Sequence, residues 1–475
     1  MKQISNPLMQ SHILPVVLTA FLAVGCSDNS QKTQNTNKQQ YAHAKKSPLN
    51  KNYFTQDKSK KSFSHAIRGL SNEEEDLFVL GKSFFTIPWV EAPAATTARD
   101  GLGPLFSANT CIHCHPNNGA GVAVTKDGTM SRSLLLRLSH KNVKNHPLLK
   151  SNGFVPDATY GAQLSQNGNA KVPAEGKPVV SYEEINASYP DGTAYRLRIP
   201  QYHIENLGYG PLDKETVVSP RIGLALVGLG LLERISEKDI LAHQDIDDKD
   251  GDGISGKANY AFDPESNTTK LGRFTWKASA TSVKHQSAGA AHNDMGLSNP
   301  LFPAHNCTKK QTACLESIKS SGFGFDLPEQ RLNAIAFYLS NLAIPKQSSP
   351  KKHLEGQTLF KTLNCTACHV PSYKTTDNIS IHPYSDLLLH DMGESLADGR
   401  SEFLATAKEW RTPALWGIGR YKKVSGEANY LHDGRARSIE EAILWHGGEA
   451  EQSKEAFMSL NGKQRTKVLQ FLNSL

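Results

Sequence analysis

Two short motifs of cysteine and histidine are the part of this sequence with the clearest chemical meaning. In each, two cysteines flank two residues and a histidine follows directly. The motif residues are Cys111, Cys114 and His115 in the first copy and Cys365, Cys368 and His369 in the second. The chain holds 7 Cys and 18 His among 475 residues, so random placement would give on the order of 0.004 such motifs. Both copies therefore need a chemical explanation.

Three kinds of site use paired cysteines, and the spacing separates them. A zinc ribbon pairs two Cys-x-x-Cys motifs 15–20 residues apart, whereas Cys114 and Cys365 lie about 250 positions apart. A thioredoxin-type dithiol does not need a histidine directly after the second cysteine. Haem attachment uses all three residues, because two thiols add to the vinyl groups and the imidazole binds iron. The sequence therefore predicts two covalently attached c-type haems.

The elements around the two motifs are also repeated. A Leu-Phe pair precedes the first cysteine of each copy, at Leu105-Phe106 and at Leu359-Phe360. Apolar residues recur at helical spacing in "RLNAIAFYLSNL" (331–342) and in "RTKVLQFLNSL" (465–475). Each half is thus expected to close with a similar helix, and Pro345–Lys352 is expected to be a linker.

These repeats predict a mostly α-helical fold with two cytochrome c-like domains. The first domain (63–345) is expected to be enlarged by a long, partly irregular insertion of about 200 residues between its haem motif and its closing helix. The second domain (346–475) is expected to be compact.

Two cysteines remain near the middle of the chain. Cys307 and Cys314 lie seven positions apart in "HNCTKKQTAC". In an oxidising compartment such a pair is expected to form a local disulfide. The bond would contribute about 2–3 kcal/mol to stability.

The acidic stretch "DKDGDGISGKAN" (248–259) is similar to a calcium-binding loop. Asp248, Asp250 and Asp252 occupy positions 1, 3 and 5, and Gly253 occupies the position of the sharp turn. Position 12 is Asn259, where an EF-hand has glutamate. The pattern predicts calcium held by three carboxylates and backbone carbonyls, with a solvated acidic turn as the alternative.

A sixth ligand or an open face at each iron decides between electron transfer and chemistry. Met295 in "NDMG" and Met392 in "HDMG" lie in similar polar turns that end with glycine. They are candidate distal ligands, one for each haem. The alternative for both is an ordinary buried methionine.

The N-terminus predicts export. The apolar run Ile13–Gly25 is too short to cross a bilayer but suits a signal peptide, here residues 1–25. The run ends in "LAVGC", which resembles a bacterial lipobox, so Cys26 is expected to carry lipid. The polar stretch 26–62 is expected to be a flexible tether. We expect a lipoprotein of the periplasm or outer membrane, with lipid as its only membrane contact.

The composition is that of a soluble globular protein, with 38% hydrophobic and 21% charged residues. The net charge of +7 comes from lysines and arginines that are scattered rather than gathered into stripes. Nucleic acid is therefore not an expected partner.

Several longer motifs point to known families. The stretch Trp410–Gly448 contains "WRTPALWGIG", "YLHDGRARSIEEAI" and "LWHGG", and resembles the C-terminal part of bacterial di-haem cytochrome c peroxidases and of the related methylamine-utilisation enzyme. From about Leu77 to the end, the chain more closely resembles the bacterial di-haem oxidoreductase family, often labelled thiol oxidoreductases. That resemblance rests on "YGPL", "DGDGISGKAN", "LGRFTWKA", "DMGLSNPLFP", "DLLLHDMG" and "YLHDGRARS", in this order.

The resemblance implies roles for further residues. The peroxidase loop that carries a distal methionine falls on His446, which is therefore the main candidate ligand of the second haem. For the distal side of the first haem, His203, His292 and Met295 remain open. "RFTWK" offers Arg273, Trp276 and Lys277 as groups near a distal oxygen, with core packing as the alternative. Either Trp276 or Trp89 is a possible electron relay.

The resemblance also implies a function. We expect a peroxidase-like di-haem oxidoreductase that receives electrons from a small periplasmic carrier or from a partner protein, and that reduces peroxide. One alternative is a non-enzymatic electron-transfer protein with both irons six-coordinate. Another is an oxidase of a specific partner protein.

Overall fold

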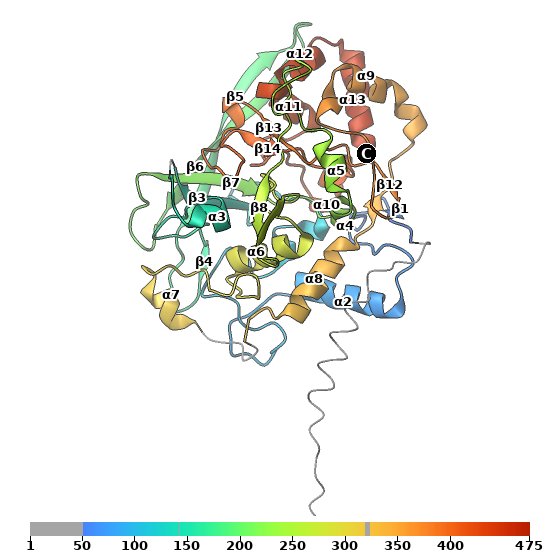
Figure 1. The fold of residues 1–475 in the computed structure, drawn as a ribbon. Coiled ribbons are helices and arrows are strands. Elements are labelled where there is room, and N and C mark those ends of the chain that lie inside the picture. The colour runs from blue at the N-terminus through green and yellow to red at the C-terminus, as the bar shows by residue number, and fades with distance from the viewer. Residues whose placement is uncertain (1–50, 142, 319–323) are drawn as a thin grey trace, which may run out of the picture. The chain divides into compact units, whose positions relative to one another are not determined.

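The computed structural model describes residues 51–141, 143–318 and 324–475 (Figure 1). Its helices are α2 (Asn72–Thr86), α3 (Leu148–Asn152), α4 (Leu229–Glu233), α5 (Glu237–Leu241), α6 (Val283–Met295), α7 (Thr312–Ser317), α8 (Glu329–Ser340), α9 (Leu354–Thr362), α10 (Tyr421–Ser425), α11 (Ile439–Leu444), α12 (Glu451–Met458) and α13 (Gly462–Ser474). Its strands are β1 (Phe54–Thr55), β2 (Leu105–Phe106), β3 (Leu134–His140), β4 (Asn167–Gly168), β5 (Lys177–Ser188), β6 (Ala194–Glu205), β7 (Thr216–Ile222), β8 (Tyr260–Asp263), β9 (Thr268–Leu271), β10 (Ile344–Pro345), β11 (Tyr373–Lys374), β12 (Ser380–Ile381), β13 (Leu389–Asp391) and β14 (Glu409–Arg411).

Each half of the chain contains two crossing helices. In the first half α2 packs on α8, and in the second α9 packs on α13 (Figure 1). A glycine lies at each crossing: a Cβ at Gly81 would overlap the carbonyl of Ala334, and a Cβ at Gly356 would overlap that of Lys467. The missing side chains let the two backbones approach closely. Both halves therefore contain a pair of helices that pack closely at a glycine.

The two Leu-Phe pairs lie in different elements, contrary to their similar sequence context. Leu359 and Phe360 belong to α9, and Phe360 contacts Phe471 of α13 with ring centroids 5.5 Å apart. Leu105 and Phe106 instead form β2, which pairs with β4. In the first half Phe85 of α2 makes the equivalent contact, 5.4 Å from Tyr338 of α8. The helix of the first half therefore lies further upstream of its motif.

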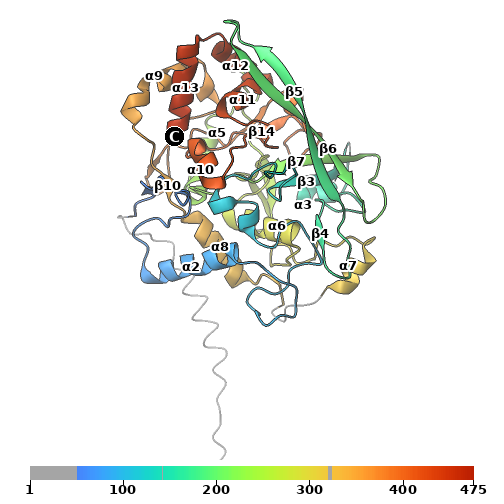
Figure 2. The same ribbon diagram turned by 180° about the vertical axis from the view of Figure 1, so that it is seen from behind.

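The fold is not mostly α-helical, so this sequence-based expectation was wrong. The structure is 30% helical and 21% strand. Most of the strand lies in the long insertion, above all in the hairpin of β5 and β6, where Lys177 pairs with Glu205 and Ser188 with Ala194. This hairpin runs along one flank of the molecule (Figure 2). Every sheet in the described residues is two-stranded.

Two large hydrophobic cores fill the interior. One lies around α2, α4, α6 and α8, and the other around α9, α11, α12 and α13. Tyr189 and Leu197, from the hairpin region of the insertion, belong to the second core. The insertion therefore packs on both halves, and residues 51–475 form one unit. The expected division at 345/346 stays a prediction.

The expected signal peptide and the lipid-bearing Cys26 lie outside the described residues. Within the expected tether, Tyr53 and Ser62 are buried, and the guanidinium carbon of Arg234 lies 4.9 Å from the centroid of the Tyr53 ring. The chain thus enters the fold earlier than its polar composition suggests. None of the helices in the described ranges has the length and apolar character needed to cross a membrane.

Candidate functional site

The first Cys-x-x-Cys-His motif forms a tight turn that presents its histidine to a cavity. Residues Cys111–His113 form a 3-10 turn, and the amide of His115 donates to the carbonyl of Cys111 at 3.1 Å. The His115 Nδ1–H donates to the Leu224 carbonyl at 2.8 Å. Burial lowers the pKa of His115 to about 4, so the ring is neutral. Its Nε2 is therefore the atom left for a metal.

The second motif repeats this arrangement. Cys365–Ala367 form a 3-10 turn, and the His369 amide donates to the Cys365 carbonyl at 3.0 Å. The His369 Nδ1–H donates to the Tyr384 carbonyl at 2.9 Å. Burial lowers the pKa of His369 to about 4. A backbone carbonyl thus orients each motif histidine in the same way.

The four motif cysteines are free thiols rather than disulfides. Burial raises the pKa of both Cys111 and Cys365 to about 12, so they are not reactive thiolates. In the described ranges, no group of three His, Cys, Asp or Glu side chains that includes a cysteine lies close enough to share a metal ion. The structure therefore does not favour a zinc site or a redox dithiol.

Each motif lines its own cavity. The cavity at the first motif has a volume of about 570 Å³, and the cavity at the second about 190 Å³. Gly223 borders both cavities, and a Cβ there would lie 2.8 Å from the Cys114 carbonyl oxygen and 3.0 Å from His115 Cε1. Two thiols, a free imidazole nitrogen and an apolar cavity fit a haem at each motif.

The two cavities share a wall. The residues that line both are Ile222, Gly223, Leu224, Trp276, Arg411, Pro413, Ala414 and Tyr421. The Trp276 Nε1–H donates to the Ile222 carbonyl at 2.8 Å, two residues before the Leu224 carbonyl that holds His115. A chain of hydrogen bonds and two peptide units therefore links the first motif histidine to an indole at the second cavity.

His446 lines the second cavity together with His369. Its Nδ1–H donates to the Ala442 carbonyl at 2.7 Å, so Nε2 is free, as in His369. Burial lowers the pKa of His369, the hydrogen bond to the Tyr384 carbonyl opposes this, and the nearby His446 ring lowers the pKa further. Met392 also lines this cavity and is half-buried. Both candidate distal ligands of the second haem therefore face the right space.

The distal candidates of the first haem divide into two groups. Met295 and His292, both on α6, line the first cavity. His203 lies on β6 with a side chain 54% exposed, and it lines neither cavity. His285, which sequence reasoning missed, also lines the first cavity, with Nδ1 3.2 Å from the Thr281 hydroxyl. His285 is the third residue of α6 after the N-cap Ser282, and this position carries no sequence signal for a ligand.

The three candidate residues of the "RFTWK" segment lie in different surroundings. Arg273 donates to the carbonyl of Ile235 at 2.8 Å and borders neither cavity, so its surroundings give no support to a catalytic role. The buried Lys277 donates to the carbonyls of Thr406 and Glu409 at 2.7 and 2.9 Å. Trp276 borders both cavities. Of these three residues, Trp276 has the position expected of a relay.

The acidic loop brings together a slightly different set of carboxylates from the one expected. Asp248 and Asp250 lie with Asp245 in a group whose ligand atoms are within 4.8 Å of one another. The Asp252 carboxylate instead accepts from the Ile254 amide at 2.9 Å. Asp245 precedes the motif-like stretch and was not an expected ligand. Calcium binding stays a prediction.

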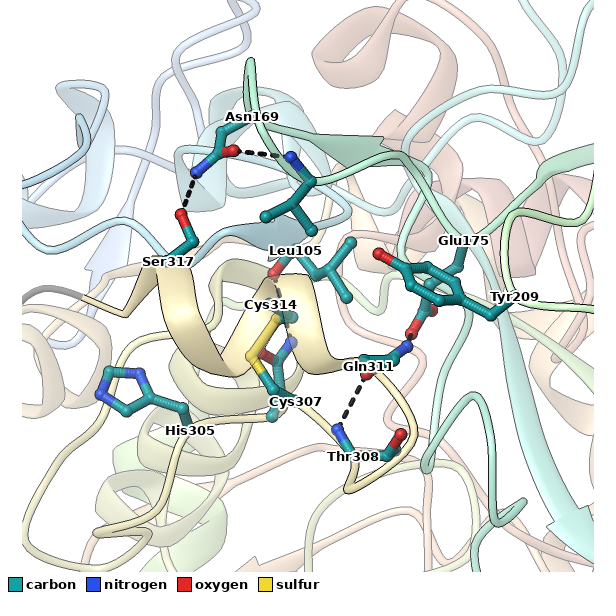
Figure 3. The surroundings of a disulfide bond; sticks show 12 residues. Leu105, Asn169, Glu175, Tyr209, His305, Cys307, Thr308, Gln311, Cys314 and Ser317 are labelled. Atoms are coloured by element: carbon teal, nitrogen blue, oxygen red, sulfur yellow. Dashed lines mark hydrogen bonds between the residues drawn. A yellow bond between two sulfur atoms is a disulfide. The ribbon is translucent and has the colours of Figure 1, made fainter.

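Cys307 and Cys314 are joined by a disulfide with their Cα atoms 5.8 Å apart (Figure 3). The bond ties the segment before α7 to that helix, and Cys314 is fully buried. Thr308 and Gln311 lie between the two cysteines. Gln311 is buried as well, whereas Lys309 and Lys310 are exposed, so the loop lies at the surface of the insertion with Gln311 and Cys314 buried.

Comparison with known proteins gives one result. A search of curated proteins found no match. The sequence profile of a family described as "Di-haem oxidoreductase, putative peroxidase" matches residues 41–475. The match includes both motifs, both cavities and the wall between them, and the chain therefore belongs to this di-haem oxidoreductase family, whose cofactors are haems.

Proposed function

We propose that this protein is a c-type di-haem oxidoreductase that reduces peroxide with electrons delivered by a small electron-carrier protein. Cys111 and Cys114 would attach one haem and Cys365 and Cys368 the other. His115 and His369 would be the proximal ligands. The observation that carries the proposal is the pair of motif histidines, each with a free Nε2 at a cavity, on either side of one shared wall.

The haems, when bound, supply one-electron redox chemistry. Reduction of one hydrogen peroxide to two waters consumes two electrons and two protons, so a protein with two redox centres suits the reaction. The chain's own residues hold the proximal imidazoles in one tautomer, exclude water from the cavities and position groups that exchange protons with the substrate.

The two cavities support different roles. The second is small, and His446 lines it together with His369, which favours a six-coordinate centre that only transfers electrons. The first is three times larger and has polar residues on α6. The extra space favours substrate access there. We therefore assign peroxide reduction to the first motif and electron entry to the second.

The shared wall supports the route between the centres. His115 and Trp276 are joined through the Leu224 and Ile222 carbonyls. Arg411, which borders both cavities, is held by the Thr275 carbonyl at 2.8 Å. Electrons would pass from the second centre to the first through Trp276.

Haem content and spectra of the exported protein test the proposal. Cys111→Ser and Cys365→Ser should each remove one of two covalent haems, measured as iron per chain and as haem stain on a denaturing gel. The oxidised wild type should show a high-spin component that changes when peroxide is added. Two low-spin haems indifferent to peroxide would overturn the peroxidase assignment and favour a non-enzymatic electron-transfer protein, which Met295 or His292 would allow by occupying the sixth position.

We propose that the protein works in the periplasm or at the outer membrane as a lipoprotein anchored through Cys26. Fractionation of cells that express the chain with Cys26→Ser tests this: the variant should leave the membrane fraction.

A further inference from the structure

Three segments that lie far apart in the sequence bring lysines together near the shared wall. Arg420 joins the segments, because its guanidinium donates to the Asp57 carbonyl at 2.7 Å and to the Lys346 carbonyl at 3.0 Å. The Phe63 ring packs edge-on against the Tyr421 ring, with the ring centroids 6.4 Å apart. We call the six exposed lysines of these segments the lysine surface; they are Lys58, Lys60, Lys61, Lys346, Lys422 and Lys423.

The lysine surface has an excess of positive charge. Residues 55–64, 346–352 and 417–427 contain nine lysines and arginines but only two acidic residues, Asp57 and Glu427. The Asp57 carboxylate already lies 2.6 Å from Nε2 of His65. Within the described residues, none of the six lysines forms an ion pair with a carboxylate. Their charges are therefore available to a partner.

The helix α10 connects the lysine surface to the second cavity. Ile418 and Tyr421 line the second cavity, and Tyr421 also lines the first. The exposed Lys422 and Lys423 follow Tyr421 directly in the chain. Tyr421 stacks on Tyr430, another residue of the second cavity, with ring centroids 5.6 Å apart and an angle of 17° between the planes. The short helix thus has lysines in solvent and an aromatic ring at the cavity.

Contacts with the first motif hold α10 in place. The Asn117 side-chain amide donates to the Val424 carbonyl at 2.8 Å, and the Ser425 hydroxyl donates to the Ala120 carbonyl at 2.6 Å. The Ser64 hydroxyl donates to the Asn117 carbonyl at 3.2 Å. A helix of five residues would not be stable alone, and these bonds fix it beside the turn of the first motif (Figure 2).

From these observations we infer that the lysine surface is the docking site of the electron carrier, and that the carrier is a small acidic protein. This inference rests on the proposed function, which requires a carrier. Exposed charges act over about 10 Å at 0.1 M salt, so lysines attract an acidic protein and speed its association. In the docked complex one electron leaves the carrier, which is oxidised, and reaches the second centre, which is reduced.

Anionic lipid headgroups are also attracted by lysines. A membrane has no use for a surface beside two redox cavities, however, whereas an electron carrier must approach one of them closely. The position of Tyr421 at both cavities therefore favours the carrier protein.

Binding of the soluble domain of cytochrome b5, a small acidic electron carrier, tests the inference in the full-length, haem-loaded protein. Fluorescence anisotropy of the labelled domain should give a Kd that rises as salt is added. Lys422→Glu with Lys423→Glu should raise the Kd at low salt at least about tenfold. This double variant should also slow reduction of the second haem by the reduced domain in stopped flow. Mitochondrial cytochrome c, which is basic, should not bind.

The matched control makes the same change in net charge elsewhere. Lys171 and Lys309 are both exposed. They lie near α7, away from α10, since Asn169 donates to Ser317 of that helix and the disulfide ties the loop of Lys309 to it (Figure 1). Lys171→Glu with Lys309→Glu should bind the acidic domain as the wild type does. Equal losses in the two double variants would reflect net charge alone and would overturn the inference.

The remaining outcomes separate the inference from the proposed function. A protein that reacts with peroxide but does not bind the acidic domain, or binds it equally well after Lys422→Glu with Lys423→Glu, loses only the docking site. A protein that binds the domain through these lysines but ignores peroxide loses only the peroxidase assignment.

Vesicles of phosphatidylglycerol test the lipid alternative in Cys26→Ser protein. If the α10 double variant loses vesicle binding but keeps its affinity for the acidic domain, the lysine surface binds membrane and the inference is wrong. Two haems per chain, unchanged midpoint potentials and an unchanged far-ultraviolet circular dichroism spectrum establish that a variant is folded. If the α10 variant fails this criterion, Lys60→Glu with Lys61→Glu replaces it.

Discussion

At the scale of single residues, the orientation of the motif histidines is set by the main chain. His115 and His369 each donate from Nδ1 to a backbone carbonyl, and so does His446. A backbone carbonyl can accept a hydrogen bond from Nδ1 only if Nδ1 carries the proton. In a neutral imidazole Nε2 then has a free lone pair. Three separate rings are thus prepared for the same kind of ligation.

The sixth ligand of the second haem gives the first residue-scale prediction. His446→Gly should convert this haem from low spin to high spin in the oxidised spectrum, because it removes the imidazole that lines the same cavity as His369. Added imidazole should restore the low-spin spectrum. Met392→Leu, in the same cavity, is the matched control and should leave the spin state unchanged. If instead Met392→Leu produces the high-spin form, Met392 is the ligand.

Glu175 gives a prediction on pH and stability. Burial raises its pKa to about 8 from 4.5 in the unfolded chain. Between these values the folded protein binds more protons than the unfolded chain, so this residue lowers stability as pH rises from about 4.5 to 8. The side chain in Glu175→Gln does not titrate. Loss of the hydrogen bond from the Ser165 amide lowers the stability of the variant by an amount that does not depend on pH.

The stability of Glu175→Gln relative to wild type should therefore rise across this pH range and stay level above it. Urea unfolding at several pH values measures the difference. A difference that is constant from pH 5 to 8 would contradict the raised pKa.

Residue types predicted the haem cofactors of the family but not the rest of the site. The two Cys-x-x-Cys-His motifs can be recognised in the sequence, because haem attachment and iron binding need cysteine and histidine side chains at a fixed spacing. The shared wall cannot be recognised in this way. Ile222 and Leu224 contribute backbone carbonyls, and Gly223 is needed because there is no room for a side chain. His285 and Asp245 were missed because nothing in their local pattern distinguishes them from ordinary helix and turn residues.

At the scale of elements, the crossing of α9 and α13 depends on one glycine. Gly356→Ala should destabilise the protein by about 1–3 kcal/mol, because its Cβ would overlap the Lys467 carbonyl and force the helices apart. Gly289→Ala in α6 is the matched control, since its Cβ would lie 3.7 Å from the nearest atoms of Phe302. That variant should be neutral or slightly stabilising. Equal effects of both in chemical denaturation would contradict this account of the crossing.

The disulfide loop is a second element with a measurable role. Cys307→Ser with Cys314→Ser should cost about 2–3 kcal/mol, the loop entropy that the bond removes from the unfolded chain. Because Thr308 of this loop and Asn306, directly before Cys307, line the first cavity, the double variant should also raise the KM for peroxide. A reduced stability with an unchanged KM would show that the remaining contacts of Thr308 and Asn306 hold the loop alone.

The strands explain why the fold class was misjudged. The β5–β6 hairpin turns at Pro190-Asp191-Gly192, where Gly192 has a φ of 84°, and such a sequence is a recognisable turn signal. Its flanks alternate only weakly between apolar and polar residues, because the outer face is solvated and the inner face uses Tyr and Arg as well as Leu. The helices, by contrast, have apolar residues at clear helical spacing, as in 331–342.

At the scale of the whole molecule, the insertion forms part of the wall between the two cavities. Ile222, at the end of β7, and Trp276 both come from the insertion, and Arg411 comes from the second half. These residues border both cavities. The sequence predicted two haem units but not that a third segment lies between their cavities, because the contacts of Ile222 with Trp276 and of Leu224 with His115 join residues 54 and 109 positions apart.

Two tryptophans allow this arrangement to be tested. Trp276 borders both cavities, whereas Trp89 borders only the first and donates from Nε1 to the Phe84 carbonyl at 3.2 Å. If electrons cross at the shared wall, Trp276→Phe should slow reoxidation of the second haem by peroxide in a single turnover, and Trp89→Phe should not. Both substitutions remove one indole hydrogen bond, worth about 1 kcal/mol, so the comparison cancels that loss.

Midpoint potentials of both haems must match wild type in each variant, so that a slower rate reports the route rather than the driving force. Slowing by Trp89→Phe alone would place the crossing outside the wall formed by Ile222–Leu224, and electrons would then have to leave the second cavity by another side.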